Sequence, residues 1–420
     1  MTSLLLVACG TGGTAHSKKD TSVDSLSKVK ANLVFTCQHE RYPEPSADSD
    51  ILFKYARWLQ KNNQLKQDKI VDAESERLYR IAAENGHAKA SVNLQNGAMR
   101  GQYKLSGDEQ LRFSQRLMHA GVAAGYYFIG IFLNQGSAGV VQDKDKALRY
   151  FRKAADEGNA NAQQYVGNKL APSDMAPDVA RQMRHCAAEQ ANGEAAVDLG
   201  FSLKLTKQFQ ESLEAFQLGV AAGEETSANI LSGAFRNPSS TNALYYLGQQ
   251  EDLERADRYE RIWSILADYS YASPKVPEIN DIIPLPPAKL PSWDGKLKWL
   301  EERKANIPPQ KPSEALIEQL AKAKGLDPAT GKPLPGSQAF IRAEEFHFCY
   351  SGRPCPRAGY WRVLWLSDRR IVKTEVIRQF KEGDIMPTWE VERFFERPWP
   401  LGDKTTYTQE AVKWSFYGDA

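Results

Sequence analysis

Small and aliphatic residues recur along the first half of the chain with spacings of 35, 37, 33 and 32 residues. A reference position holds a small residue in five successive copies: Gly86, Gly121, Gly158, Ala191 and Gly223. The residue four positions further is also small, and the residue eight positions further is aliphatic, as in Ala90 and Leu94 of the first copy. A glycine at the reference position can adopt the left-handed turn that ends a helix, and the small residues beyond it let a neighbouring helix approach closely. This period predicts a mainly α fold, a right-handed α-solenoid of helix-turn-helix repeats over residues 31–272.

The third copy shows the pattern most completely. Residues 154–167 read A-A-x-x-G-x-x-x-A-x-x-x-V-G, which resembles the Sel-one-like repeat, a relative of the tetratricopeptide repeat. The second and fifth copies lack the Ala-Ala pair and depart from this pattern. The resemblance implies a protein-binding surface, since such solenoids are scaffolds, adaptors and inhibitors.

A different pattern follows residue 236. Amphipathic spacing predicts helices over 252–269 and 313–324. Between them, residues 273–293 contain six prolines, which fix φ and remove backbone donors, and also several isoleucines and leucines. We therefore expect residues 273–325 to form a proline-rich strap, packed along the solenoid, and a helix. The proline and glycine residues of 326–337 predict a linker.

Residues 338–420 are predicted to form a small β-rich (α+β) domain. β-branched and aromatic residues alternate or cluster over 343–350, 360–366, 371–380 and 411–417, as in strands. This tail holds five of the nine tryptophans of the chain. Tryptophans in so small a domain mostly build its core, and any surplus would anchor a protein partner. The candidates for such an anchor are Trp361, Trp365, Trp389 and Trp399.

The N-terminus has the pattern of a bacterial lipoprotein signal. Residues 6–9 read Leu-Val-Ala-Cys and match the lipobox, whose cysteine becomes the diacylated N-terminus after cleavage. The basic stretch that usually precedes the apolar run is missing, so we expect the true start codon to lie upstream. Residues 1–9 are thus a predicted signal, with Cys9 as the lipidation site, and residues 10–30 a flexible tether. The residue after Cys9 is Gly10, whereas an aspartate there would retain a lipoprotein in the inner membrane. This resembles the sorting signal of a lipoprotein in the outer membrane that faces the periplasm.

Four cysteines remain beyond Cys9, an even number that suggests disulfides in an oxidising compartment. Cys349 and Cys355 flank the turn-forming residues 351–354, which favours a bridge between them. Cys37 and Cys186 would form the second pair, although sequence alone cannot bring them within reach.

Zinc ligation is the alternative for these cysteines. Cys37 with His39, and His185 with Cys186, would complete a Cys₂His₂ set if the two segments met, but neither pair has the spacing of a zinc finger. His347 and the two cysteines of the tail offer three ligands without a fourth. We therefore predict neither a metal site nor a cofactor.

Charge and motifs exclude several classes of function. The chain has 54 basic and 52 acidic side chains and a net charge of +2, so it has no field that favours nucleic acid or an anionic membrane. After residue 9 no apolar run approaches the roughly 20 residues of a spanning helix, so any membrane contact would go through the lipid anchor. The chain has no Gly-x-Ser-x-Gly motif and no phosphate-binding loop, and His39-Glu40 lacks the second histidine of a zinc protease. We therefore expect a protein that is not an enzyme.

Taken together, residues 35–40, the repeats and the strap resemble a proteobacterial group of Sel-one-like repeat lipoproteins with a C-terminal domain of unassigned function. Residues 355–361, followed by 383–387, are similar to a small β-domain of lipoproteins encoded beside type VI secretion effectors. Some members of the group resemble immunity proteins against secreted phospholipases. The resemblance implies a protein partner, a toxic effector that the chain neutralises by occlusion. The alternative is an adaptor solenoid that organises other envelope proteins.

Overall fold

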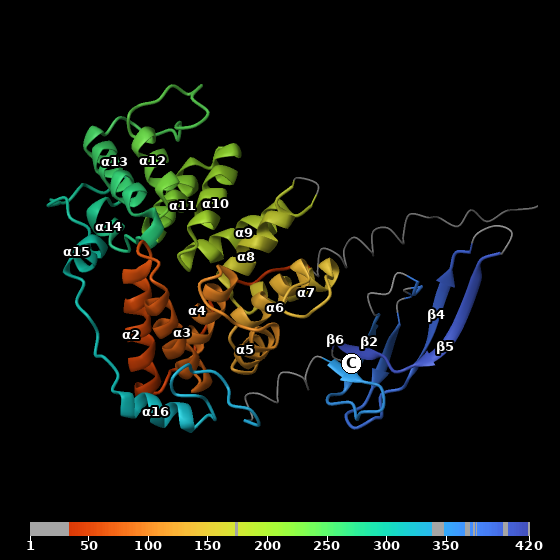
Figure 1. Ribbon diagram of the computed structural model, residues 1–420. Coiled ribbons are helices and arrows are strands. Elements are labelled where there is room, and N and C mark those ends of the chain that lie inside the picture. Colours follow the sequence, from red (N-terminus) through yellow and green to blue (C-terminus); the bar gives the residue numbers. More distant parts are fainter. Residues whose placement is uncertain are drawn as a thin grey trace, which may run out of the picture.

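Figure 1 shows the computed structural model, which describes residues 33–172, 175–337, 348–365, 370–372, 374, 376–397 and 402–418. Helices follow one another to residue 268 and stack side by side as an α-solenoid. Their bounds are α2 (Ala47–Asn63), α3 (Lys69–Glu84), α4 (Ala88–Met99), α5 (Gly107–His119), α6 (Ala124–Gln135), α7 (Lys144–Asp156), α8 (Ala160–Leu170), α9 (Pro177–Glu189), α10 (Gly193–Leu205), α11 (Phe209–Ala222), α12 (Glu225–Ala234) and α13 (Leu253–Asp268).

Each predicted repeat is a helical hairpin whose turn lies at the reference position. The backbone there is left-handed in all five copies, with φ of 89° at Gly86, 70° at Gly121, 101° at Gly158, 60° at Ala191 and 88° at Gly223. These turns join α3 to α4, α5 to α6, α7 to α8, α9 to α10 and α11 to α12. The predicted solenoid is thereby confirmed, with α2 preceding the first hairpin and α13 following the last.

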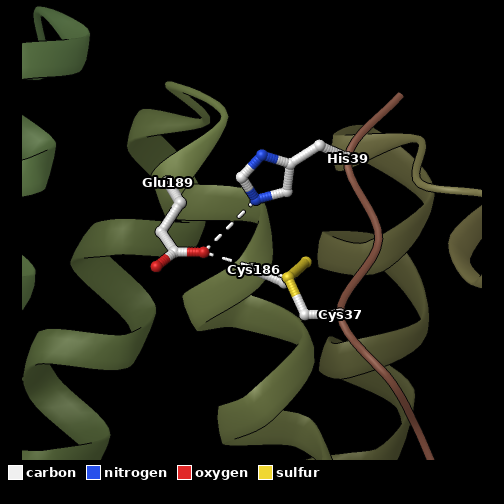
Figure 2. A group of neighbouring side chains, drawn as sticks. All are labelled: Cys37, His39, Cys186 and Glu189. Atoms are coloured by element: carbon white, nitrogen blue, oxygen red, sulfur yellow. Dashed lines mark hydrogen bonds and ion pairs between the residues drawn. A yellow bond between two sulfur atoms is a disulfide. The ribbon is translucent and has the colours of Figure 1, made fainter. Parts of the chain in front are cut away.

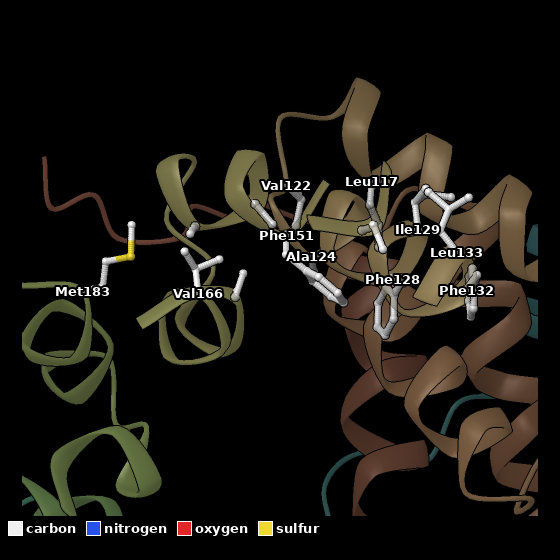
Figure 3. Packing of buried hydrophobic residues seen from close by; sticks show 14 of the residues in the cluster. Leu117, Val122, Ala124, Phe128, Ile129, Phe132, Leu133, Phe151, Val166 and Met183 are labelled. Carbon is white, nitrogen blue, oxygen red and sulfur yellow. The ribbon is translucent and has the colours of Figure 1, made fainter. Parts of the chain in front are cut away.

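Successive hairpins pack because an aromatic ring of one copy fits against a glycine of the copy before it. A Cβ at Gly130 would lie 2.7 Å from the Phe151 ring, and a Cβ at Gly200 would lie 2.7 Å from the Phe216 ring. Both rings are buried. Phe151 belongs to a core that runs from α5 to α9 (Figure 3), in which Phe128 and Met183 are also buried. The small residues of the repeat therefore serve to bring neighbouring hairpins together.

The proline-rich strap packs against the last hairpins, as the sequence predicts. It contains the short helices η1 (Ser270–Ala272), α14 (Ile279–Ile282) and α15 (Lys298–Ala305). Ile279, Ile282 and Ile283 are buried in one core with residues of α11, α12 and α13. The Gln217 side chain also donates a hydrogen bond to the Ile283 carbonyl over 2.8 Å.

The segment predicted as a linker, residues 326–337, differs from that expectation. It follows α16 (Glu314–Lys322), and both pack on α3 at the start of the solenoid. Leu326 is completely buried among residues of α3 and α16. The Arg77 side chain donates a hydrogen bond over 2.6 Å to the Pro328 carbonyl. The prolines and glycines thus form a tight turn, because Leu326 and Arg77 give this segment a surface to bind.

The tail contains strands, as predicted, arranged in two antiparallel sheets. One has the order β1-β6-β2-β3, from β1 (Phe348–Tyr350), β2 (Gly359–Leu364), β3 (Ile377–Phe380) and β6 (Lys413–Gly418). The other pairs β4 (Trp389–Phe395) with β5 (Lys404–Glu410). The sequence did not predict β4 and β5, because β5 is polar except for Tyr407 and because Glu390, Glu392 and Arg393 interrupt the apolar residues of β4. Residues 343–347 of the first predicted strand lie outside the described residues.

The tail contacts the solenoid at the beginning of α7. The Lys146 ammonium donates a hydrogen bond over 2.8 Å to the Phe416 carbonyl, and Arg149 donates one over 3.0 Å to the Tyr417 hydroxyl. Arg362 of β2 forms an ion pair over 3.0 Å with Asp143. Within the described ranges, no helix is both long and apolar enough to cross a bilayer.

Candidate functional site

A polar hollow of about 600 Å³ lies where the two ends of the solenoid meet. Helices α2, α3 and α4 and the loops that follow α2 and α4 form most of its wall, and the turn after α13 supplies the rest. The lining residues, nearly all of them polar, are Arg57, Gln60, Asn63, Gln64, Gln67, Lys69, Asp72, Asn93, Asn96, Arg100, Gly101, Gln102, Tyr271 and Ser273. We call this feature the end hollow.

A network of hydrogen bonds fixes the floor of the end hollow. Gln60 and Asp72 are only 4% and 5% exposed. The Asp72 carboxylate accepts hydrogen bonds from the Asn63 and Gln102 amides, both over 2.9 Å. The Gln60 carbonyl oxygen accepts one from Arg57 over 2.9 Å and another from the Tyr79 hydroxyl over 3.0 Å. Because these buried groups bind one another, the floor keeps its shape without a ligand.

Basic side chains surround this floor. Arg57 and Arg100 line the end hollow, together with Lys69, whose ammonium lies 3.2 Å from the Asp72 carboxylate. Desolvation by burial raises the pKa of Tyr79, which bonds to the floor, to about 12, so that phenol stays a neutral donor at physiological pH. The hollow therefore offers guanidinium, ammonium and amide donors, which suit carboxylates and backbone carbonyls of a partner.

The two ends of the solenoid are joined directly beside the end hollow. Asn306, at the end of α15, accepts hydrogen bonds at its side-chain oxygen from the Trp58 indole over 3.0 Å and the Asn62 amide over 3.1 Å. Its own amide donates to the Asn62 oxygen over 2.9 Å. Figure 1 shows the strap running from α13 past α2 to α16. Tyr271 lines the hollow together with Arg57, and its ring lies 5.4 Å from the Arg303 guanidinium of α15.

The structure brings together three of the four residues considered for zinc. Cys37 and Cys186 form a disulfide with a Cα–Cα distance of 5.6 Å, which ties the extended N-terminal segment to α9 (Figure 2). The His39 Nε2 atom lies 3.3 Å from Glu189 Oε2. His185 lies beside the cluster, with Nδ1 3.6 Å from the other oxygen of Glu189. Sequence reasoning missed Glu189, which lies one helical turn after His185.

Cys349 and Cys355 are free thiols, so the predicted bridge between them is wrong for this structure. Both are buried in the core of the tail. The Cys349 thiol donates to the Pro354 carbonyl over 3.4 Å, and the Cys355 thiol donates to the Arg357 carbonyl over 3.0 Å. Each thiol therefore bonds to a backbone carbonyl and not to the other sulfur. Desolvation by burial raises the pKa of both thiols, which keeps them protonated. His347 lies outside the described residues.

Trp361 cannot serve as the predicted partner anchor, because it is completely buried. Its indole donates to the Arg357 carbonyl over 3.1 Å, and its ring packs edge-on against Phe416. Alternation along β2 directs Trp361 and Val363 into the core. Side chains on a strand alternate between its two faces, and the face of β2 that carries Trp361 is the one that packs on the core.

The other predicted tryptophans differ in their positions. Trp365 and Trp389 are half-buried at the edge of the same core. The Trp365 indole donates to the Thr374 carbonyl over 2.7 Å, and the Trp389 ring packs edge-on against Trp414. Both retain some exposed surface and stay candidates. Trp399 and the predicted lipidation site Cys9 lie outside the described residues.

Family models match two parts of the chain. The Sel1 repeat matches residues 62–87 and 123–159, which include α3 and the helices α6 and α7. A domain of unknown function, DUF6396, matches residues 227–334. That range covers α13, the strap and α16 and ends before the β-rich tail, so the family of unassigned function corresponds to the strap and not to the tail. No curated protein matches the chain.

Several solved structures are similar to the chain. A Pseudomonas aeruginosa protein, PA5086, is 25% identical with a TM-score of 0.46, over 60% of this chain and 95% of its own. The immunity protein PA5087 of the same organism is 23% identical with a TM-score of 0.46, over the same shares. A Sel1 repeat protein from Oxalobacter formigenes is 17% identical with a TM-score of 0.38, over 52% of this chain and 87% of its own. The helical hairpins and the matched repeats agree: the chain contains Sel1-like repeats in an α-solenoid, and its residues 227–334 are similar to DUF6396.

Proposed function

We propose that the chain binds and neutralises a secreted antibacterial effector, a phospholipase, by covering its active site. It would do so as a lipoprotein, anchored through Cys9 to the outer membrane and facing the periplasm. PA5087, one of the similar structures, is an immunity protein. The observation that carries the proposal for this chain is the end hollow itself.

The end hollow has the properties of a protein-binding site. Its buried polar floor is fixed before a partner arrives, so little conformational entropy is lost on binding. Its basic rim of Arg57, Lys69 and Arg100 favours an acidic loop of a partner and speeds the encounter with it. A stable complex covers roughly 800 Å² per partner, so contacts must extend from the hollow onto the neighbouring helices. A loop inserted here would hold the effector against the solenoid and exclude its substrate.

The test uses secreted effectors encoded next to the gene and the full chain with its upstream start. We expect one-to-one binding, loss of phospholipase activity, and sensitivity of the deletion strain to the effector in the periplasm. The variant Arg57→Glu/Arg100→Glu should weaken binding at least 100-fold, because it reverses the charge of the rim. Lys322→Glu, an exposed residue of α16, is the matched control and should bind normally.

Two results would contradict the proposal. One is an unchanged affinity of the charge-reversed variant for the effector, which would show that the end hollow is not part of the interface. The other is the absence of any neighbouring effector that is bound or toxic to the deletion strain. Binding of other envelope proteins without inhibition of a toxin would then favour the adaptor function.

A further inference from the structure

The cluster around the disulfide has the composition and spacing of a zinc site. Potential ligand atoms of Cys37, His39, Cys186 and Glu189 all lie within 4.8 Å of one another. Zinc bound tetrahedrally, at about 2.0–2.3 Å from nitrogen, oxygen and sulfur, separates its ligands by about 3.3–3.8 Å. The two distances from Glu189 Oε2, 3.3 Å to His39 Nε2 and 3.8 Å to Cys37 Sγ, have this length. Figure 2 shows the histidine ring and the carboxylate facing each other above the sulfur atoms.

We propose that the reduced protein binds one zinc ion through the thiolates of Cys37 and Cys186, the Nε2 atom of His39 and the carboxylate of Glu189. The disulfide and the metal are alternative states of the same four residues. Reduction by a phosphine converts the disulfide to two thiols, while the phosphine takes an oxygen atom from water and becomes its oxide. On binding, each thiol releases one proton to the buffer and zinc accepts a sulfur lone pair from each thiolate.

The ligands stay close to one another when the disulfide is open, because other contacts hold the N-terminal segment. The backbone N–H of Glu40 donates to the Gln190 side chain over 2.8 Å. Gln163 donates to the Gln38 carbonyl over 2.9 Å. The segment also lies directly on Gly158, where a Cβ would be 2.6 Å from the His39 carbonyl carbon. Two ligands are therefore positioned on each side, from the segment and from α9, before a metal arrives.

The surroundings also suit a thiolate-binding transition metal. The side chains of His39 and Glu189 are 52% and 40% exposed, so an ion can enter from solvent. His185 contacts the Glu189 oxygen that faces away from His39 and would orient the carboxylate. Two sulfur ligands select zinc over magnesium and calcium, which prefer oxygen. In the oxidised protein only imidazole and carboxylate groups remain, and affinity should fall at least 100-fold.

The test is a zinc titration of the full chain in competition with a chromophoric chelator. Phosphine-reduced protein should bind one equivalent, and cobalt in its place should give a sulfur-to-metal charge-transfer band. The oxidised protein should show neither. His39→Asn and Glu189→Gln, both surface changes, should weaken zinc binding at least 10- to 100-fold, because the loss of a ligand costs no less than the loss of a residue that orients one. His185→Asn should keep the one-to-one stoichiometry and the cobalt band, because this residue is not a ligand.

Cys37→Ser/Cys186→Ser, which retains Cys349 and Cys355, separates this cluster from the thiols of the tail. Zinc binding that persists in this variant would place the metal in the tail and overturn the proposal. Equal zinc affinity of the reduced and oxidised proteins would overturn it as well. A helical circular dichroism spectrum that is unchanged on reduction confirms that the titrated protein is folded.

Discussion

Opening the disulfide between Cys37 and Cys186 should substantially lower the free energy of unfolding. The bridge closes a loop with a sequence separation of 149 residues, which spans the helices from α2 to α9. In the chain-entropy model, a loop of this length restricts the unfolded state by about 5 kcal/mol. That value is an upper limit, since the unfolded chain retains some compactness. We expect Cys37→Ser/Cys186→Ser to lose about 3–5 kcal/mol.

The assay is urea unfolding of the oxidised wild type, the reduced wild type and the double variant, followed by helical circular dichroism in the presence of a zinc chelator. The reduced wild type and the variant should have the same lower midpoint, because both lack the crosslink. Cys349→Ser is the control for the reductant, since its thiol is free in either state. Equal midpoints for the oxidised and reduced wild type would refute the reasoning, because the crosslink would then not restrict the unfolded chain.

Three further predictions follow from packing and burial. Gly200→Ala places a methyl group against the Phe216 ring and should cost about 1–3 kcal/mol in urea unfolding; an unchanged midpoint would contradict the predicted contact. Trp361→Ala should destabilise the tail by about 3–5 kcal/mol while the helical signal of the solenoid remains, and a tail that unfolds as in the wild type would contradict its core position. Docking of the tail buries Lys146 of α7 and lowers its pKa to about 7 from its usual 10.5, so between these pH values the protein binds more protons when the tail is undocked. Docking should therefore strengthen as pH rises from about 7 to 10.5, by at most about 1.4 kcal/mol per pH unit, and the tryptophan-fluorescence melting midpoint of the tail should rise accordingly. Lys146→Met should abolish this pH dependence, and its persistence would assign the effect to another group.

The sequence predicts the solenoid well because its signal is local and repeated. The turn at Gly158 needs only a glycine and its neighbours within one hairpin, and the same pattern returns in each copy. The strap was predicted for a similar reason, since Ile279 and Ile283 are too apolar for a free segment. The repeat turns and the apolar character of the strap depend on residues that lie close together along the chain, so the sequence pattern can predict them.

The end hollow and the place of Glu189 in the cysteine cluster could not be predicted, because both depend on contacts between distant segments. Gln60 and Asp72 are polar, and the amphipathic pattern of a helix predicts that such residues face solvent. In the structure both are buried in a hydrogen-bond network. Glu189 joins Cys37 only because the N-terminal segment crosses α9. The composition of 326–337 predicts a linker, because it gives no sign of the surface of α3 that receives Leu326. In each case the hydrophobic and polar pattern around a residue does not indicate which distant residue it contacts.

The contact between the two ends of the solenoid restricts how this protein can evolve. Open solenoids change length readily, because a hairpin can be duplicated without disturbing its neighbours. Here Asn306 must reach Asn62, and Leu326 must reach the core of α3. One additional hairpin would move the last repeats away from the first, so both contacts would be lost together. We expect relatives with this closure to keep a constant number of repeats and to diversify instead through the side chains that line the end hollow.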